Sequence, residues 1–402
     1  MSFKQDVKKN FPKWPIYDNS EIKALEKVIK SGKWWCGAPG VHEGENVWKF
    51  QEEFANFQGA EYCIAVFNGT VAIEAALIAL GVGLGDEVIV SDYTFVASAS
   101  AVIATNAIPI FCDVNPETFV MDVSQVEKLI TKRTKAVIPV HLGGNPVEMD
   151  KLKELADRYN INIVEDCSHA HGSCYKDKLV GNWGNAGTFS FQASKVLTSG
   201  EGGAIICNSK TLAEKIYSYT DCGREKNKHP YYHSTYGTNY RMTEYQAAIL
   251  REQMKKFNTQ HETRNRNAKY LSEKLNEIDG INTMKPTPGT TKLGWYVFPF
   301  VFEPEKFRGL TKLEFYKKLN RNGIPTDDCY PPLHGLDCFK NLNLKKGIDY
   351  SNANWGKEKS IDTNFPIVSD IYSRSIEFPQ ELLLAKKEQL DSVVNFIKSL
   401  KN

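Results

Sequence analysis

Short hydrophobic runs alternate with longer amphipathic stretches through the first half of the chain. The runs at residues 62–66, 88–91, 108–112, 136–140 and 161–165 have the length and composition of buried strands, and the stretches at 71–80 and 94–105 have helical spacing. Repeated strand–helix units of this kind are typical of a mainly parallel sheet with helices on both faces. The pattern therefore predicts an α/β fold.

The pattern changes after residue 195. A strand at 204–207, a short helix at 211–219 and a long helix from about 243 come next, followed by strands near 295–302 and helices near 312–320 and 384–400. Because a single hydrophobic core rarely serves more than about 250–300 residues, a chain of 402 residues should fold into more than one domain. We predict a large domain over residues 1–277, which includes an N-terminal arm, and a smaller α+β domain over residues 278–402.

The composition is that of an ordinary globular protein and indicates small-molecule partners. Hydrophobic residues make up 42% and charged residues 24% of the chain, and the formal net charge is +2. This charge provides no basic surface for nucleic acid, and no apolar run approaches the roughly 18 residues that a membrane helix needs. We therefore expect a cytoplasmic protein that binds neither nucleic acid nor membrane. Nine scattered cysteines without C-x-x-C spacing favour reduced thiols.

Two segments at expected strand ends carry groups that could bind a ligand. Gly69 and Thr70 lie between a strand and a helix, where free backbone N–H groups favour an anion, although Thr70 is also an ordinary helix cap. Asp166 lies at the end of a strand, at the edge where open α/β sheets bind ligands. Its carboxylate could cap a helix, pair with a protonated ring nitrogen, or bind a metal together with His169 or His171. No further ligand pattern supports the metal.

Lys195 follows an alternating stretch at 187–192 and precedes a glycine-rich turn. A lysine that acts as a nucleophile must lose its proton, which burial or a neighbouring cation promotes. Seen alone, Lys195 is equally consistent with a catalytic residue and with an exposed lysine of a turn.

Together these groups match the needs of pyridoxal 5′-phosphate (PLP). PLP requires an anchor for its phosphate, a flat surface over its ring, a carboxylate that keeps the pyridine nitrogen protonated, and an amine for its aldehyde. Gly69 and Thr70, an aromatic residue at 93–95, Asp166 and Lys195 supply these groups, with Ser190 as a further polar group near the lysine. The combination predicts a PLP enzyme and is more specific than any one of its parts.

At these residues the chain resembles the DegT/DnrJ/EryC1/StrS aminotransferases, which are fold-type I PLP enzymes. The motifs that carry the resemblance are FNGTVAIEAAL (67–77), GDEVIVSDYTFVASASAV (85–102), TKAVIPVHLGGNPVEMD (134–150), VEDCSHAHGS (164–173), TFSFQASKVLTSGEGGAI (188–205) and YGTNYRMTEYQAAIL (236–250). The resemblance runs nearly end to end. It implies a mainly parallel, seven-stranded sheet in the large domain and PLP as the cofactor.

The resemblance also implies roles for individual residues. Lys195 would be the Schiff-base lysine, and Asp166 the partner of the pyridine nitrogen. Asn239 matches a residue that the family contributes to the phosphate site of the neighbouring subunit, which implies a homodimer with shared active sites. The full set of implied cofactor contacts is Gly69, Thr70, Phe95, Asp166, His169, Ser190, Lys195 and Asn239.

His169 narrows the resemblance, because many nucleotide-sugar members have glutamine at this place. His169 and the Cys222-Gly-Arg224 motif resemble the branch that contains L-glutamine:scyllo-inosose and 2-deoxy-scyllo-inosose aminotransferases and 3-amino-5-hydroxybenzoate synthase. The implied reaction moves an amino group from L-glutamine or L-glutamate to a keto-cyclitol or keto-sugar in two ping-pong half-reactions. Three alternatives stay open: a nucleotide-keto-sugar aminotransferase, a PLP-dependent dehydratase or aromatase, and a PLP-binding regulator. The lack of a DNA-binding motif disfavours the last.

Further residues are candidates for contacts with the substrates. Tyr330 and His334 match the small-domain segment that reaches toward substrate in the family, although a lone histidine is more often structural. The carboxylate of the amino donor needs a cation, for which Arg224 and Arg241 are candidates. We interpret Arg241 as structural, because it lies in the subunit-contact motif.

Overall fold

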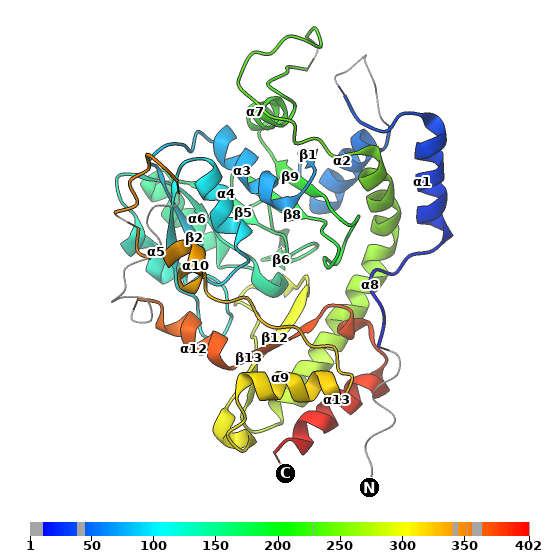
Figure 1. The fold of residues 1–402 in the computed structure, drawn as a ribbon, viewed down its shortest axis with the longest axis vertical. Coiled ribbons are helices and arrows are strands. Elements are labelled where there is room, and N and C mark those ends of the chain that lie inside the picture. Colours follow the sequence, from blue (N-terminus) through cyan, green and yellow to red (C-terminus); the bar gives the residue numbers. More distant parts are fainter. Residues whose placement is uncertain are drawn as a thin grey trace.

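A seven-stranded sheet forms the centre of the large domain (Figure 1). The computed structural model describes residues 11–37, 45–226, 228–340, 345–351, 353–355 and 364–401. The strands of this sheet are β1 (Tyr62–Val66), β2 (Glu87–Ser91), β3 (Ile108–Cys112), β4 (Thr134–Ile138), β5 (Asn162–Asp166), β8 (Ala186–Ser190) and β9 (Gly203–Cys207). Their order is β1-β9-β8-β5-β4-β2-β3, in which β9 runs antiparallel to both neighbours and the other pairs are parallel. The predicted mainly parallel sheet is confirmed.

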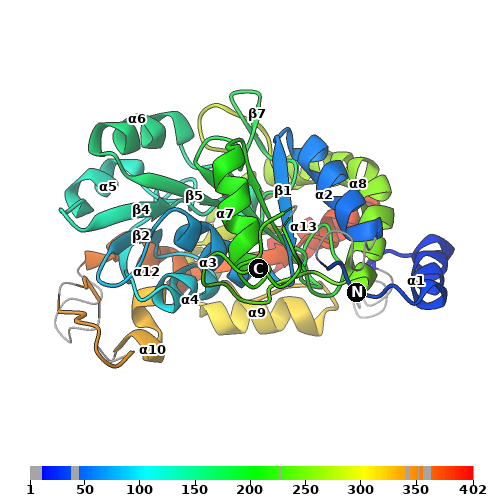
Figure 2. The same ribbon diagram turned by 90° about the horizontal axis from the view of Figure 1, so that it is seen from above.

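Helices lie on both sides of this sheet, as the view from above shows (Figure 2). They are α2 (Glu45–Gln58), α3 (Gly69–Ala79), α4 (Ala97–Ala104), α5 (Val123–Leu129), α6 (Met149–Tyr159) and α7 (Lys210–Thr220). Most residues of α3 are buried, because it packs against α4, α7 and the central strands. A helix that is apolar nearly all round is stable only in such a place. The burial of α3 sets its N-terminus at the end of the sheet.

The long helix α8 (Glu244–Asn276) connects the large domain to a smaller one below it (Figure 1). Its N-cap is Thr243, whose side chain forms a capping box with Gln246. The smaller domain contains the antiparallel sheet β10 (Ile281–Thr283), β12 (Val297–Phe302) and β13 (Ser375–Pro379), with helices α9 (Lys312–Arg321) and α13 (Lys387–Ser399). We propose the domain division near residue 278, just beyond the end of α8. Among the described residues, no helix is long and apolar enough to cross a membrane.

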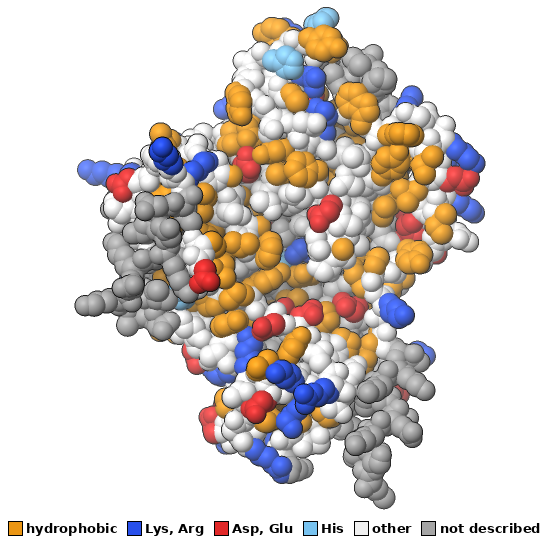
Figure 3. All heavy atoms as spheres, viewed as in Figure 1, with side chains coloured by type: hydrophobic (Ala, Val, Ile, Leu, Met, Phe, Trp, Pro, Cys, Tyr) orange, Lys and Arg blue, Asp and Glu red, His pale blue; other side chains and the backbone are white. Residues whose placement is uncertain are grey.

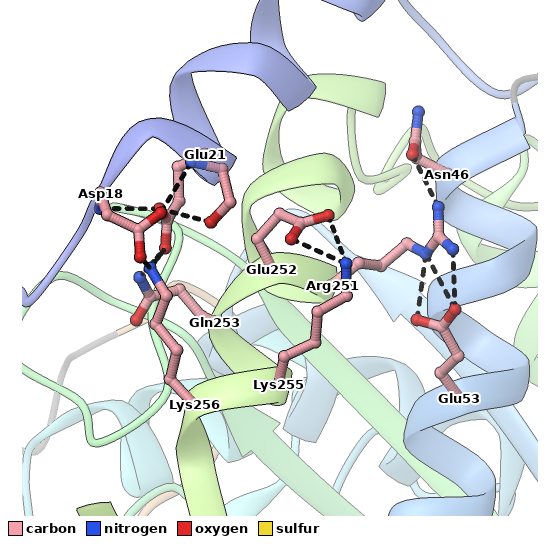
Figure 4. Close-up of polar contacts among 10 residues, drawn as sticks. Asp18, Glu21, Asn46, Glu53, Arg251, Glu252, Gln253, Lys255 and Lys256 are labelled. Atoms are coloured by element: carbon pink, nitrogen blue, oxygen red, sulfur yellow. Dashed lines mark hydrogen bonds and ion pairs between the residues drawn. The ribbon is translucent and has the colours of Figure 1, made fainter.

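Helix α1 (Asn19–Ser31) and helix α2 lie against α8 and are held there by charged contacts (Figure 4). Lys256 of α8 pairs with Asp18 at 2.9 Å and with Glu21 at 2.6 Å. Arg251 pairs with Glu53 of α2 at 2.8 Å. The sequence pattern indicated only an N-terminal arm here, and these helices are stabilised by contacts with a distant part of the chain.

The chain that follows α9 returns from the smaller domain to the edge of the large sheet. It includes α10 (Asp337–Lys340) and α12 (Pro366–Arg374). Asn354 accepts a hydrogen bond from the backbone N–H of Phe111 at 2.9 Å and donates one to its carbonyl at 2.7 Å, as a neighbouring strand would. The carboxylate of Asp113 accepts the backbone N–H groups of Ile367 and Val368. These contacts anchor the later part of the returning segment beside the end of β3.

A short antiparallel sheet also joins the two domains. Strand β11 (Thr290–Lys292) pairs with β6 (Cys174–Tyr175), which pairs with β7 (Lys178–Leu179).

On the face shown in Figure 3, hydrophobic side chains gather over the middle, whereas charged side chains are frequent over the smaller domain.

Candidate active site

A cavity of about 490 Å³ lies at the carboxyl end of the central strands. Its volume is in the range of roughly 300–1,000 Å³ that is usual for small-molecule sites. Its lining comes from the N-terminus of α3, the loop between β2 and α4, the ends of β5 and β8, and segments of the smaller domain. The lining includes these candidates from the sequence: Gly69, Thr70, Phe95, Asp166, His169, Ser190, Lys195 and Tyr330.

Lys195 lies in the turn after β8 with 8% of its surface exposed. Its backbone N–H donates to the carbonyl of Gln192 at 2.9 Å, which tightens the turn and directs the side chain inward. Burial lowers the pKa of its amine to about 7, although the carboxylates of Asp166 and Glu377 act in the opposite direction. The amine is therefore partly neutral near neutral pH, as a nucleophilic lysine must be. This burial excludes an exposed turn lysine.

Asp166 is the last residue of β5 and is oriented by two hydrogen bonds. The hydroxyl of Ser98 donates to Oδ2 at 2.7 Å, and the backbone N–H of Ser168 donates to Oδ1 at 3.1 Å. The Ser98 hydroxyl also lies 3.0 Å from that of Thr94. Sequence reasoning missed Ser98 and Thr94. Both belong to the motif that contains Phe95, at the start of the α4 segment, so their position was the available signal.

The N-terminus of α3 faces the cavity beside Ser190. The side chain of Asn68 accepts the backbone N–H of Val71 at 3.0 Å, so Asn68 and not Thr70 caps the helix. The helix cap had been an open alternative for Thr70, and this geometry leaves its hydroxyl to the cavity lining. A Cβ at Gly69 would lie 2.7 Å from Cβ of Ser190, so only glycine fits. The result is a tight niche at a helix N-terminus, which favours an anion.

His169 and the aromatic residues Phe95, Tyr296 and Tyr330 form one wall of the cavity. The backbone N–H of Gly143 donates to Nδ1 of His169 at 3.3 Å, so the ring proton is on Nε2, which lies 3.4 Å from the hydroxyl of Tyr330. Burial holds the pKa of His169 well below its usual value, so the ring is neutral. Phe95 is 52% exposed at the cavity, and its ring centroid is 5.7 Å from that of Tyr330. Phe95 therefore offers a flat surface to a ligand.

His334 is not among the residues that line the cavity. It is buried, and its backbone N–H donates to Oδ1 of Asp92 at 2.9 Å while its Nδ1 contacts Oδ2 of the same carboxylate. The backbone N–H and Nδ1 of His334 therefore both face Asp92, directly after β2. Of the segment predicted to reach toward substrate, Tyr330 lines the cavity, and His334 anchors the segment through Asp92.

Arg224, Arg241 and Asn239 also lie outside the cavity lining. Arg224 and Arg241 pair with the same carboxylate, Asp221, at 2.9 and 2.6 Å. Asn239 is exposed and lies two residues before Arg241 in the chain. Of the described residues that line the cavity, Lys195 is the only lysine or arginine. The cation expected for the donor carboxylate is therefore not provided by either arginine within this chain's own cavity.

One group of potential metal ligands occurs among the described residues, formed by His141, Glu165 and Cys167. The Glu165 carboxylate already accepts three backbone N–H groups, from Gly181, Trp183 and Gly184, each at 2.7 Å. Nδ1 of His141 accepts the N–H of Val147 at 3.1 Å, so its Nε2–H donates to Glu165 at 3.1 Å. These bonds occupy the His141 and Glu165 atoms that a metal would need. The cluster is a buried hydrogen-bond network that supports the strand end carrying Asp166.

The DegT/DnrJ/EryC1/StrS aminotransferase family matches this chain over residues 15–394. The chain belongs to this family. Among its relatives, the L-glutamine:2-deoxy-scyllo-inosose aminotransferase of Streptoalloteichus tenebrarius is 37% identical, with 95% of this chain and 92% of the relative covered. The enzyme of the same name from Micromonospora echinospora is 38% identical, with 96% and 93% covered.

Solved structures of family members share the whole fold. The crystal structure of 3-amino-5-hydroxybenzoic acid synthase superimposes with a TM-score of 0.88 and 30% identity, covering 97% of this chain and 98% of that one. The structure of DesV from S. venezuelae in complex with a ketimine intermediate superimposes with a TM-score of 0.82 and 30% identity, covering 96% of this chain and 95% of that one. The chain is thus an aminotransferase with the fold-type I architecture, and both sequence predictions are confirmed.

Proposed function

We propose that this aminotransferase uses PLP to move an amino group from L-glutamine or L-glutamate to a keto-cyclitol, such as an inosose. The observation that carries the proposal is a single cavity that holds the buried amine of Lys195, the carboxylate of Asp166 and the niche at Gly69. PLP, when bound, supplies an electron sink for the negative charge that forms at the donor's α-carbon.

The residues of the cavity fit this cofactor. Gly69, Thr70 and Ser190 line the niche for its phosphate, and Phe95 offers the surface that would cover its ring. Asp166 would hold the proton on the pyridine nitrogen, with Ser98 orienting the carboxylate. The Lys195 amine would attach to the aldehyde and, once released, carry a proton to or from the donor's α-carbon.

The polar lining of the cavity supports a neutral polyol as the amino acceptor. The described lining outside the proposed cofactor contacts includes hydroxyl and amide groups of Gln192, Ser194 and Tyr330. A nucleotide sugar would bring a diphosphate, and Lys195 is the only lysine or arginine in the described lining. The name of the relatives, L-glutamine:2-deoxy-scyllo-inosose aminotransferase, agrees with a cyclitol. We propose Tyr330 as an acceptor contact, and neither His334 nor Arg224, because of these three only Tyr330 lines the cavity.

We also propose a homodimer in which Asn239 completes the phosphate site of the partner subunit. Asn239 is exposed and lies outside its own cavity. The preceding loop exposes the rings of Tyr231 and Tyr236, at 80% and 88%. Exposed aromatic side chains of this kind are frequent at protein interfaces. A dimer by analytical ultracentrifugation, and weaker PLP binding by Asn239→Ala with the dimer intact, are the expected results; a monomer that binds PLP normally would contradict this part.

The reaction can be tested with purified protein and PLP. Borohydride reduction should attach the cofactor to Lys195, located by peptide mass spectrometry, and Lys195→Ala should lose all turnover. With L-glutamine as donor, scyllo-inosose should yield an aminocyclitol, whereas a nucleotide keto-sugar should not react. Turnover of the nucleotide keto-sugar alone, or an aromatic product from an aminoshikimate, would replace the proposed acceptor by one of the alternatives.

A further inference from the structure

Tyr296 lies directly against the amine of Lys195, although the two residues come from different domains. Its ring centroid is 3.9 Å from Nζ of Lys195. The ring is also 4.1 Å from that of His169, centroid to centroid. The hydroxyl of Tyr296 lies 2.8 Å from that of Ser194, the residue before the lysine. No motif that pointed to the cofactor site contains Tyr296.

The backbone around Tyr296 is packed closely enough to keep the ring in this place. Trp295 has a positive φ of 48° and is buried, and Gly294 donates its N–H to the carbonyl of Gly144 at 3.3 Å. A Cβ on Gly144 would lie 2.5 Å from the backbone nitrogen of Trp295, so the two segments meet without room for a side chain. Strand β11, just before this segment, is paired to β6 of the large domain. The loop therefore holds Tyr296 rigidly against the large domain.

The face of an aromatic ring attracts a cation, and it does so more strongly when water is excluded. The other groups near the Lys195 amine divide into two kinds. The carboxylates of Asp166 and Glu377 favour the ammonium form. Burial of the amine disfavours it, and His169 and His171, whose pKa values burial holds low, add no neighbouring positive charge at neutral pH. The exposed carboxylate of Glu201 also lines the cavity, on the glycine-rich turn.

We propose that Tyr296 is a positioning residue that holds the protonated amine of Lys195 on its ring face after the lysine has been released from the cofactor. The inference rests on the proposed function, in which the released lysine accepts the proton of the donor's α-carbon. A long, flexible lysine side chain loses little conformational entropy when it reattaches to the cofactor if its amine is already held in one position. The ring both restricts the amine to the cavity and stabilises the charge that it gains.

The test compares Tyr296→Phe, which keeps the ring, with Tyr296→Leu and Tyr296→Met, which lack it. In the full-length protein without cofactor, trace acetylation with acetic anhydride over a range of pH, followed by peptide mass spectrometry, measures the pKa of Lys195 itself. A cation–ring interaction of about 0.5–2 kcal/mol corresponds to a pKa that is about 0.4–1.5 lower in the ring-free variants. Tyr296→Phe should titrate as the wild type does.

A second readout is the rate of the enzyme with L-glutamine. We expect kcat to fall about 2- to 30-fold in Tyr296→Leu or Tyr296→Met, with KM less affected, and to stay near wild type in Tyr296→Phe. Unchanged titration of Lys195 in both ring-free variants overturns the inference. An equal change in Tyr296→Phe also overturns it, because the hydroxyl contact with Ser194 would then be responsible. Acetylation needs no cofactor, so failure of the PLP proposal would appear separately, as absence of borohydride-trapped cofactor on Lys195.

Discussion

Replacing Gly69 by alanine tests whether the niche between α3 and β8 holds the cofactor phosphate. The added Cβ would lie 2.7 Å from Cβ, 3.2 Å from Oγ and 3.3 Å from Cα of Ser190. Carbon atoms in contact are normally about 3.5–4.0 Å apart, so either Ser190 or the start of α3 must move. Both border the proposed phosphate site. Alanine is also the better helix former, so helix propensity works against any loss that is observed.

The expected size of the effect follows from the cost of overpacking. Adding a methyl group to a filled site costs about 1–3 kcal/mol, and about 1.4 kcal/mol corresponds to a tenfold change in affinity. If the niche must open to relieve the contact, the Kd for PLP should rise about 5- to 140-fold. If the cost falls instead on the folded state, the Tm of the cofactor-free protein should decrease.

The assay is a titration of cofactor-free protein with PLP, followed by absorbance, together with thermal unfolding in the absence of PLP. Gly83→Ala is the matched control, because a Cβ at Gly83 would meet no atom within 4 Å and its φ is not in the left-handed region. It should bind PLP as the wild type does. Wild-type PLP affinity and wild-type Tm in Gly69→Ala would refute the reasoning, since the contact with Ser190 would then be relieved at no cost.

Three further predictions concern other contacts of the site. Ser98→Ala removes the hydroxyl that donates to Asp166 at 2.7 Å, and hydrogen bonds to charged groups contribute about 1.5–3 kcal/mol, so kcat/KM should fall about 12- to 140-fold. Ser98→Thr keeps the hydroxyl, and equal losses in both variants would contradict this role. The Lys195 amine has a pKa of about 7 in the folded protein against 10.5 ordinarily. Between these values the unfolded state binds more protons, so the free energy of unfolding of the cofactor-free protein should rise with pH through this window. The free energy of unfolding, measured with urea at both ends of the window, should rise less in Lys195→Met than in the wild type. An equal rise in the two proteins would exclude the buried amine as the cause. His334→Ala leaves the buried Asp92 carboxylate without its imidazole partner, and the Tm should fall in line with a loss of about 1–3 kcal/mol. An unchanged Tm would show that the pair does not anchor the Tyr330 segment.

The sequence by itself determined the type of fold and the identity of the chemically important strand ends. Strands and crossover helices have different hydrophobic periods, so their alternation was readable without any tertiary information. Asp166 ends a strand, and parallel strands present their carboxyl ends at one edge, so it could be placed at the ligand-binding edge in advance. The junction of strand and helix around Gly69 and Thr70 and the position of Lys195 after a strand follow from the same local reasoning, although the helix was expected to begin two residues later, at Val71.

Only the tertiary structure decided which residues from distant segments meet at that edge. Tyr296 reaches Lys195 because its loop packs on Gly144, and His334 turns to Asp92 because both are buried together. In the capping of α3, the sequence suggested Thr70, whereas the structure places Asn68 at the cap. Local periodicity carries no information about such pairings. They depend on how two domains pack and on which buried polar groups must find partners.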